Sequence, residues 1–194
     1  MRAPLVLASA SPRRRELLAQ LGVTFEVITA DVPEVPQPGE PAATFARRVA
    51  CDKAAMVARR CPGRCVLGAD TVVVVDGEIL GKPIDRADAR RMLRRLSGRM
   101  HQVLTAVAFM DAAGGCDEIL VESGVEFRPL SASDIEAYLD TDEPFDKAGA
   151  YGVQGYARRF VVRVDGSLSN VIGLPLDEVT DLLRRHLPAT VPAP

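Results

Sequence analysis

Short apolar runs alternate with amphipathic segments along the chain, a pattern that predicts strands and helices in turn. The first apolar run, Pro4 to Ala8, has the length of a strand. The helical pattern after it begins at Ser11 and Pro12, which suit the cap and the first position of a helix, and stops at Gly22, which suits the left-handed residue beyond a helix end. The chain is therefore predicted to begin with a strand, a hydroxyl-bearing loop and a helix N-terminus.

The same patterns divide the rest of the chain. Asp85 and Ser131 suit helix caps, and Asp76-Gly77 suits a two-residue hairpin turn. Strands are predicted at residues 24–30, 65–69, 72–75, 78–80, 100–110, 116–127, 160–164 and 170–173. Helices are predicted at residues 41–60, 85–96, 131–139 and 175–186. We see no internal repeat and no domain linker, so residues 1–194 are predicted to form a single α/β domain with a mixed sheet and a frayed tail at 188–194.

Composition narrows the class of protein. The 194 residues carry 24 Lys and Arg against 26 Asp and Glu, a net charge of −2, which argues against a general nucleic-acid binder. Neither a signal peptide nor a transmembrane span is evident, so we expect a soluble, cytoplasmic protein without membrane partners. The four cysteines and two histidines lack zinc-finger spacing, and buried or incidental thiols are the better interpretation.

Three arginines, Arg13 to Arg15, follow the predicted helix start. A helix N-terminus offers unpaired N–H groups and a positive dipole end, so it favours anions and repels cations. The cluster therefore fits a phosphate site, but an arginine run is also typical of a solvated helix face. The first helix by itself leaves both interpretations open.

A carboxylate interrupts an apolar stretch at Asp70. An acidic residue between two apolar strand segments costs free energy unless it is paired or binds a cation. Asp70 is therefore a candidate functional carboxylate, and an aspartate bonded to nearby backbone is the alternative. Glu34 follows the second predicted strand, where it either faces a ligand or lies in a solvated loop. Lys53 lies near the inner side of its predicted helix, where it either snorkels or binds a phosphate.

Two glycine-containing segments indicate ligand binding less specifically than the charged residues do. Gly81-Lys82-Pro83 is similar to the end of a P-loop, but Asp76 and Pro83 stand where that motif needs glycine and Ser or Thr. Residues 146–155 place three glycines at three-residue spacing, which lets a backbone turn sharply and approach a ligand. Gln154 would offer this segment an amide for a base edge, although such segments are more often ordinary loops.

Four stretches of the chain form an ordered set. They are Ser9-x-Ser11-Pro12-Arg13-Arg14-x-Glu16-Leu17-Leu18, Gly68-Ala69-Asp70-Thr71 with Gly81-Lys82-Pro83, Ser97-Gly98 with His101, and Asp146-Lys147-Ala148-Gly149-Ala150-Tyr151-Gly152-Val153-Gln154-Gly155. Together they resemble the Maf family of nucleoside triphosphate pyrophosphatases, from Leu5 to about Leu187. The resemblance implies an α/β fold like that of the inosine-triphosphate pyrophosphatases: a long, mixed, bent sheet flanked by helices, two lobes around a cleft, and usually a homodimer.

The resemblance also implies a reaction, in which a nucleoside triphosphate is hydrolysed to the monophosphate and pyrophosphate with a divalent cation, Mg²⁺ or Mn²⁺. Asp70 matches the general base, and Glu34 together with Asp70 would hold the metal. Phosphate-binding roles are implied for Ser9, Arg13, Arg14, Lys53 and Lys82. The positions that distinguish the branches of the family are Arg13, Thr71 and Gln154, and they resemble the dTTP/UTP-cleaving branch.

Two alternatives stay open at this point. One is the sister branch that cleaves 7-methyl-GTP, and the other is a nucleotide-binding regulator of septum formation whose catalysis is incidental. The chain departs from the family pattern at Tyr156 to Arg159 and at Leu168, beside the presumed base pocket. These departures bear on the nucleotide preference rather than on the reaction.

Overall fold

The computed structural model describes residues 5–188. Its seven-stranded sheet has the order β2-β1-β3-β5-β6-β7, and β4 pairs with β3. The strands are β1 Leu5–Ala8, β2 Phe25–Val27, β3 Val66–Val75, β4 Glu78–Leu80, β5 Met100–Met110, β6 Cys116–Phe127 and β7 Val161–Asp165. The α-helices are α1 Pro12–Gln20, α2 Ala42–Arg60, α3 Arg86–Leu96, α4 Ala132–Leu139, α5 Leu168–Ile172 and α6 Leu176–His186. Three short 3₁₀ helices span Glu143–Asp146, Ala148–Ala150 and Tyr156–Phe160.

The chain forms two compact units, and β3, β5 and β6 each pass from one to the other. Unit 1 comprises Met1–Asp70, Thr105–Val121 and Gly173–Pro194, and unit 2 comprises Thr71–Leu104 and Glu122–Ile172. In the part of the chain that the structure describes, no helix is both long enough and apolar enough to cross a membrane.

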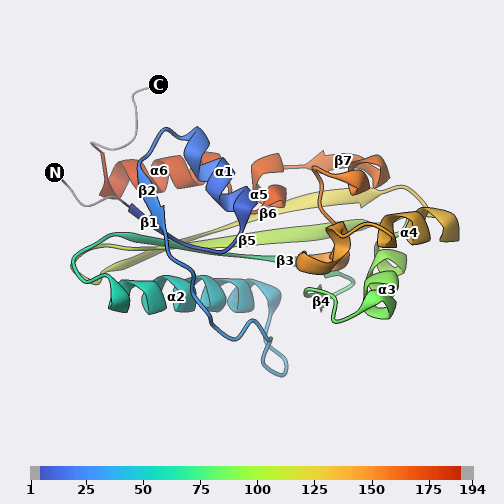
Figure 1. Ribbon diagram of the computed structural model, residues 1–194, viewed down its shortest axis with the longest axis horizontal. Coiled ribbons are helices and arrows are strands. Elements are labelled where there is room, and N and C mark those ends of the chain that lie inside the picture. Colours follow the sequence, from blue (N-terminus) through green and yellow to red (C-terminus); the bar gives the residue numbers. More distant parts are fainter. Residues whose placement is uncertain (1–4, 189–194) are drawn as a thin grey trace. The chain divides into compact units, whose positions relative to one another are not determined.

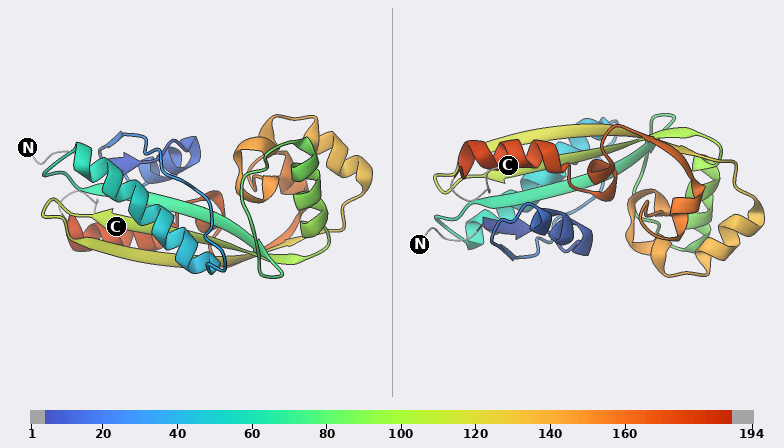
Figure 2. Two further views of the ribbon diagram at one scale, coloured as in Figure 1. Left: turned by 90° about the horizontal axis from the view of Figure 1, so that it is seen from below. Right: turned by 90° about the horizontal axis from the view of Figure 1, so that it is seen from above.

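Unit 1 is a layered α/β structure. Strand β1 pairs in parallel with β2 on one side and with β3 on the other. Helix α2 covers one face of these strands, while α1 and α6 cover the opposite face (Figures 1 and 2). All four residues of β1 are buried, because both faces of the strand are covered. The register pairs Ala8 with Gly68, so the loop that follows β1 begins beside the residues that lead to Asp70.

Unit 2 is built on α3, α4 and the three 3₁₀ helices, together with the remaining parts of the long strands. Its core holds aromatic side chains in mutual contact; Tyr138, Phe127 and Phe160 are almost fully buried. The departures from the family pattern contribute to this core. Tyr156 stacks on Tyr138 with ring centroids 5.5 Å apart, and Arg159 lies 3.9 Å over the Tyr156 ring.

Most predicted elements are confirmed within a residue or two, with three exceptions. The strand predicted at 24–30 is shorter, because β2 covers only Phe25–Val27 at the edge of the sheet. The two apolar segments around Asp70 form one strand, β3. The strand predicted at 170–173 is wrong: Leu168–Ile172 forms the helix α5, which buries Asn170. Of the tail predicted to be frayed at 188–194, residues 189–194 lie outside the described residues.

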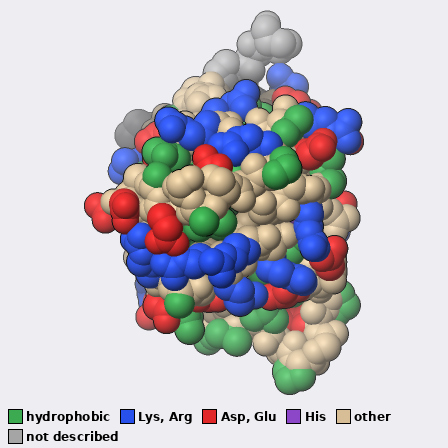
Figure 3. Space-filling view, turned by 90° about the vertical axis from the view of Figure 1, so that its right-hand side faces the viewer, with side chains coloured by type: hydrophobic (Ala, Val, Ile, Leu, Met, Phe, Trp, Pro, Cys, Tyr) green, Lys and Arg blue, Asp and Glu red, His purple; other side chains and the backbone are tan. Residues whose placement is uncertain are grey.

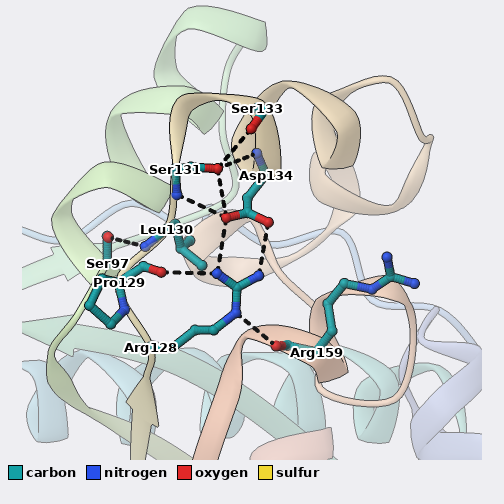
Figure 4. Close-up of polar contacts among 8 residues, drawn as sticks. All are labelled: Ser97, Arg128, Pro129, Leu130, Ser131, Ser133, Asp134 and Arg159. Atoms are coloured by element: carbon teal, nitrogen blue, oxygen red, sulfur yellow. Dashed lines mark hydrogen bonds and ion pairs between the residues drawn. The ribbon is translucent and has the colours of Figure 1, made fainter.

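A polar network fixes the start of α4 in unit 2. Ser131 is the predicted cap and forms a capping box with Asp134, and the Arg128 guanidinium donates two hydrogen bonds to the Asp134 carboxylate, at 2.9 and 2.8 Å (Figure 4). Arg128 Nε also donates to the Arg159 carbonyl, and the Ser97 hydroxyl accepts the Leu130 N–H. Ser97 of the quoted motif therefore has a structural contact in this network.

Several arginines of α3 form ion pairs on the surface of unit 2. Arg90 bonds Glu136, and Arg91 and Arg95 bond Glu78. In the face drawn in Figure 3, basic side chains form a broad band with acidic side chains among them. Such surface pairs each contribute little to stability, because water and salt screen them.

Helix α2 lies so close to β3 that Gly68 has no room for a side chain. A Cβ at Gly68 would lie 2.5 Å from the Ala50 carbonyl oxygen and 2.8 Å from the Ala54 nitrogen, both backbone atoms. We expect Gly68→Ala to lower the free energy of unfolding by about 3 kcal/mol, because the helix must move away from the strand. Urea unfolding monitored by circular dichroism measures this change.

The matched control is Gly81→Ala, because a Cβ at Gly81 meets nothing within 4 Å. This control is expected to leave the free energy of unfolding unchanged or to raise it slightly. Equal effects of the two substitutions would contradict the close packing of α2 on β3.

Candidate active site

Two carboxylates converge on one lysine in unit 1. Lys53 Nζ lies 2.8 Å from Asp70 Oδ1 and 2.5 Å from Glu34 Oε1. The side chains of Lys53 and Asp70 are 8% and 9% exposed, whereas that of Glu34 is 35% exposed. The cluster therefore has one buried carboxylate, one carboxylate open to solvent and a buried cation that neutralises both in part.

Three different segments supply this cluster. Asp70 ends the unit 1 part of β3, Lys53 lies on the inner side of α2, and Glu34 lies in the irregular stretch between β2 and α2. Because Gly68 lets α2 approach β3 closely, the lysine of the helix reaches the carboxylate of the strand. Asp70 therefore has the paired environment that its place between apolar residues requires, and it is not simply bonded to nearby backbone.

The loop after β1 forms the predicted helix cap. Ser11 is the N-cap of α1, and its hydroxyl accepts the Arg14 N–H at 3.4 Å. The Ser9 hydroxyl, almost fully buried, accepts the Ser11 N–H at 3.2 Å. Arg13 is half-buried and Arg15 is exposed, which agrees with a solvated position for Arg15.

Arg14 points inward, unlike its neighbours. Its Nε donates to the Gly173 carbonyl and its Nη1 donates to the Ala69 carbonyl, both at 2.9 Å. Burial lowers the pKa of Arg14, and the nearby Asp70 carboxylate opposes that shift. The Nη1 donor thus fixes the backbone directly before Asp70, a contact that the sequence prediction of phosphate binding does not include.

Two candidate residues of unit 2, Lys82 and Gln154, lie on two segments that contact each other. The Gly149 N–H donates to the Gly81 carbonyl at 3.0 Å, so the glycine-rich segment lies beside the residue before Lys82. Lys82 and Gln154 are exposed, and Thr71 is half-buried directly after Asp70 in the chain. The structure thus brings Ser9, Arg14, Glu34, Lys53 and Asp70 into unit 1, and Thr71, Lys82 and Gln154 into unit 2.

The glycine-rich segment is anchored by Tyr151, a buried side chain in unit 2. Its hydroxyl lies 2.8 Å from Nε2 of His101, which is also buried, and both rings contact Phe127 edge to face. Burial raises the pKa of Tyr151 and lowers the pKa of His101 to about 4. Farther along, the Tyr156 N–H donates to both Glu143 carboxylate oxygens at 3.0 Å. These contacts hold the backbone on both sides of Gln154.

Because the pKa of His101 is lowered in the native state, we expect the free energy of unfolding to depend on pH. Below about pH 6.5 the unfolded chain binds a proton at this histidine that the native state does not bind, so stability falls as pH falls towards 4. We expect this one group to reduce the free energy of unfolding by about 2 kcal/mol between pH 7 and pH 5. Urea unfolding at a series of pH values measures the slope.

The chain offers a matched control, because its only other histidine is His186. His101→Gln should remove this part of the pH dependence, whereas His186→Gln should keep it. A slope unchanged in His101→Gln would contradict a buried neutral imidazole.

The donor atoms of the cluster fit a magnesium-type cation. Among residues 5–188 no group of three or more His, Cys, Asp or Glu side chains gathers to hold a metal by itself. Mg²⁺ is, however, commonly held by one or two carboxylates together with substrate phosphates. Glu34 and Asp70 converge on one ammonium group, so their oxygens already lie around a single positive charge.

The sequence prediction missed the residues that support these carboxylates. Arg48 bonds Glu40 across the start of α2 and also reaches the Val35 carbonyl beside Glu34. These residues belong to no sequence motif. The sequence could have indicated them only through the spacing of one acidic and one basic residue, Glu40 and Arg48, which stand eight positions apart on either side of a helix start. The inward turn of Arg14 was missed as well, because spacing alone does not separate it from Arg13.

Comparison with known proteins places the chain in a family. A sequence model of the family described as Maf-like protein matches residues 4–186. Proteins of Geobacter sulfurreducens and Geobacter metallireducens, both named dTTP/UTP pyrophosphatase, are 54% identical over 184 residues and 55% identical over 183 residues. Each match covers 93% of this chain, and they cover 95% and 94% of the relatives.

A solved structure supports the fold. A HAM1 protein from Coxiella burnetii matches with a TM-score of 0.51 at 16% identity, covering 93% of this chain and 98% of that one. This likeness concerns the fold alone, and it confirms the predicted mixed sheet flanked by helices. With the match over residues 4–186 and the high identity of the relatives, the chain belongs to the Maf family.

Proposed function

We propose that the protein is a nucleoside triphosphate pyrophosphatase that hydrolyses dTTP and UTP to the monophosphate and pyrophosphate. The observation that carries the proposal is the convergence of Asp70 and Glu34 on Lys53, in a chain 54% identical to a protein named dTTP/UTP pyrophosphatase. A protein that only binds nucleotides has no need of a buried carboxylate beside a second, solvent-facing one.

Asp70 is the general base of this proposal. Hydrolysis of the α–β phosphoanhydride needs a water molecule whose proton is accepted as the oxygen attacks phosphorus. Asp70 lies 2.8 Å from Lys53 Nζ, and the Arg14 bond to the Ala69 carbonyl fixes the backbone directly before it. It is therefore a positioned acceptor for that proton.

Glu34 and Asp70 would hold the divalent cation, Mg²⁺ or Mn²⁺, that the proposed reaction uses. Such a cation supplies positive charge at the phosphate oxygens and lowers the pKa of a bound water. Lys53 bridges the two carboxylates. Its positive charge offsets part of their negative charge before a divalent cation binds.

The phosphate-binding roles are assigned as follows. Ser9 and Arg13 lie in the segment that leads into α1 and in its first turn, where the positive end of the helix dipole also favours an anion. Lys53 and Lys82 would add point charges, and Arg14 would add a guanidinium close enough to Asp70 and Glu34 to feel their charge. Together they offset the negative charge that grows on the leaving pyrophosphate.

Gln154 is proposed to recognise the pyrimidine base, with Arg13 and Thr71 as the other positions that set specificity. Its exposed amide stands on a backbone held by Tyr151 and by Glu143. A base whose edge matches the amide forms hydrogen bonds with it. A base that does not match leaves the amide without these bonds, so it binds with a less favourable free energy. The departures Tyr156 and Arg159 pack in unit 2, so they support the same backbone from the other side.

The test is a panel of nucleotides. Pyrophosphate release is measured with Mg²⁺ and with Mn²⁺ for dTTP, UTP, CTP, dATP, dGTP and 7-methyl-GTP. We expect dTTP and UTP to have the highest kcat/KM. Preference for 7-methyl-GTP would move the protein to the sister branch, and no turnover of any nucleotide would leave the nucleotide-binding regulator of septum formation as the function.

Two further expectations belong to this proposal. The family resemblance implies a homodimer, which sedimentation at several protein concentrations would measure. A cytoplasmic location is the second expectation, which fractionation of the source cells would test.

A further inference from the structure

We propose that Arg48 is a positioning residue for Glu34: with Glu40 it closes the loop between β2 and α2 and so holds the Glu34 carboxylate at Lys53. The inference rests on the proposed function, in which Glu34 is a ligand of the divalent cation. We call the residues that carry it, Arg48, Glu40, Val35 and Gln37, the Arg48 clamp.

The loop that carries Glu34 needs an anchor. Residues 28–41 contain neither helix nor strand, and Asp31 and all residues from Pro33 to Gly39 are exposed. An exposed segment without regular structure samples many conformations, and holding one of them costs conformational entropy. The Glu34 carboxylate lies 2.5 Å from Lys53 Nζ, and it stays at that position only if the backbone beside it is held as well.

The Arg48 clamp holds that backbone at three points. Arg48 Nε and Nη2 donate to the two Glu40 carboxylate oxygens at 2.7 and 2.8 Å, a bidentate pair. Arg48 Nη2 also donates to the Val35 carbonyl at 3.2 Å, directly after Glu34. Glu40 in turn accepts the Gln37 N–H at 2.9 Å. One guanidinium thus joins both ends of the segment from Val35 to Glu40.

The clamp is itself well fixed. Arg48 lies on α2, five residues before Lys53, so both contacts of the loop go to the same helix. The guanidinium packs 5.5 Å from the Phe45 ring centroid, and the Glu40 side chain is only 7% exposed. The hydrogen bonds from Arg48 and Gln37 lower the pKa of Glu40 to about 2, so the pair stays charged across the ordinary pH range.

The position of Glu34 follows from these contacts. Groups that orient a metal ligand through hydrogen bonds commonly change metal affinity by 10- to 100-fold when they are removed. Loss of the clamp leaves Glu34 chemically intact but spreads its carboxylate over more positions. The expected result is weaker binding of the cation without a comparable loss of folding.

The experiment measures Mn²⁺ binding to the full chain by electron paramagnetic resonance, with the metal alone as probe. Arg48→Ala is expected to weaken Mn²⁺ binding about tenfold, and Glu40→Gln should weaken it in the same direction. In steady-state assays both variants should need more metal for half-maximal rate, while kcat at saturating metal stays within about threefold of the parent.

Arg47→Ala is the matched control. Arg47 is the neighbouring arginine of α2, and it forms an exposed ion pair with Glu118 of β6 at 2.9 Å. Its Mn²⁺ affinity should equal that of the parent. If Arg47→Ala weakens Mn²⁺ binding as much as Arg48→Ala, or if Arg48→Ala binds Mn²⁺ like the parent, the positioning role is overturned.

Glu34→Gln separates this inference from the proposed function. If Glu34→Gln weakens Mn²⁺ binding and Arg48→Ala does not, the clamp inference fails while the metal role of Glu34 stands. If Glu34→Gln itself binds Mn²⁺ normally, the metal role of Glu34 fails, and the clamp inference falls with it.

Discussion

Asp70→Asn should lower kcat for dTTP about 10³-fold, the range expected when a general base is removed. Asparagine has nearly the same shape as aspartate, and Lys53 keeps its second carboxylate partner, Glu34, 2.5 Å away. The variant should therefore fold and should bind dTTP with little change in affinity. Stopped-flow or single-turnover measurement of pyrophosphate release gives the chemical rate, and equilibrium binding gives the affinity.

The control for this substitution is Asp76→Asn. Asp76 is exposed in the hairpin turn after β3, has a positive φ of 49° that asparagine tolerates, and pairs with surface arginines. The same loss of one negative charge there should leave kcat unchanged. Near-normal turnover by Asp70→Asn would require another general base.

Lys53→Met should have the second-largest effect, on both stability and rate. Methionine matches the length of the lysine stem but leaves the 9%-exposed Asp70 carboxylate without its cation. Breaking a buried ion pair from one side typically costs about 3–5 kcal/mol, because a buried charge stays unpaired. Turnover should fall by about 10²-fold, since a positive charge beside the reacting groups is also lost.

A double-mutant cycle tests whether the pairing is the cause. The Lys53→Met/Asp70→Asn double variant removes both charges, so it should be more stable in urea than Lys53→Met alone. Strictly additive losses in the two single variants would show that the two side chains do not stabilise each other.

Much of the fold could be predicted from the sequence because its local signals agree. The Ser11 and Asp85 caps form as expected, and Gly22 and Gly98 adopt the positive φ that suits a helix end or a turn. The hairpin of β3 and β4 follows from Asp76-Gly77. Each of these features depends on neighbouring residues only, which is why a pattern reveals it.

The errors arose where tertiary contacts decide. Val171 and Ile172 are β-branched and suit a strand, but Asn170 is buried and donates to the Val103 carbonyl and the Ser123 hydroxyl within unit 2, contacts that a helix provides. Asp70 was expected between two separate strand segments, yet β3 runs through it because Lys53 neutralises the carboxylate in part. Contacts between residues far apart in sequence leave no local pattern.

For the candidate site, residue types were predictable and their geometry was not. The acidic character of Asp70 and Glu34 and the inner position of Lys53 could be inferred from the sequence. That all three meet depends on the close approach of α2 at Gly68 and on the loop held by Arg48. The predicted phosphate, metal and base-recognition roles, and the predicted cleft between two lobes, stay predictions.

One measurement tests the central claim, that the protein hydrolyses the α–β phosphoanhydride of a pyrimidine nucleoside triphosphate. The protein is incubated with dTTP and Mg²⁺ in water enriched in ¹⁸O, and the products are identified by mass spectrometry. We predict dTMP and pyrophosphate in equal amounts, with the label in dTMP and the reaction abolished by Asp70→Asn. Release of inorganic phosphate with dTDP, or no reaction in the parent protein, would contradict the claim.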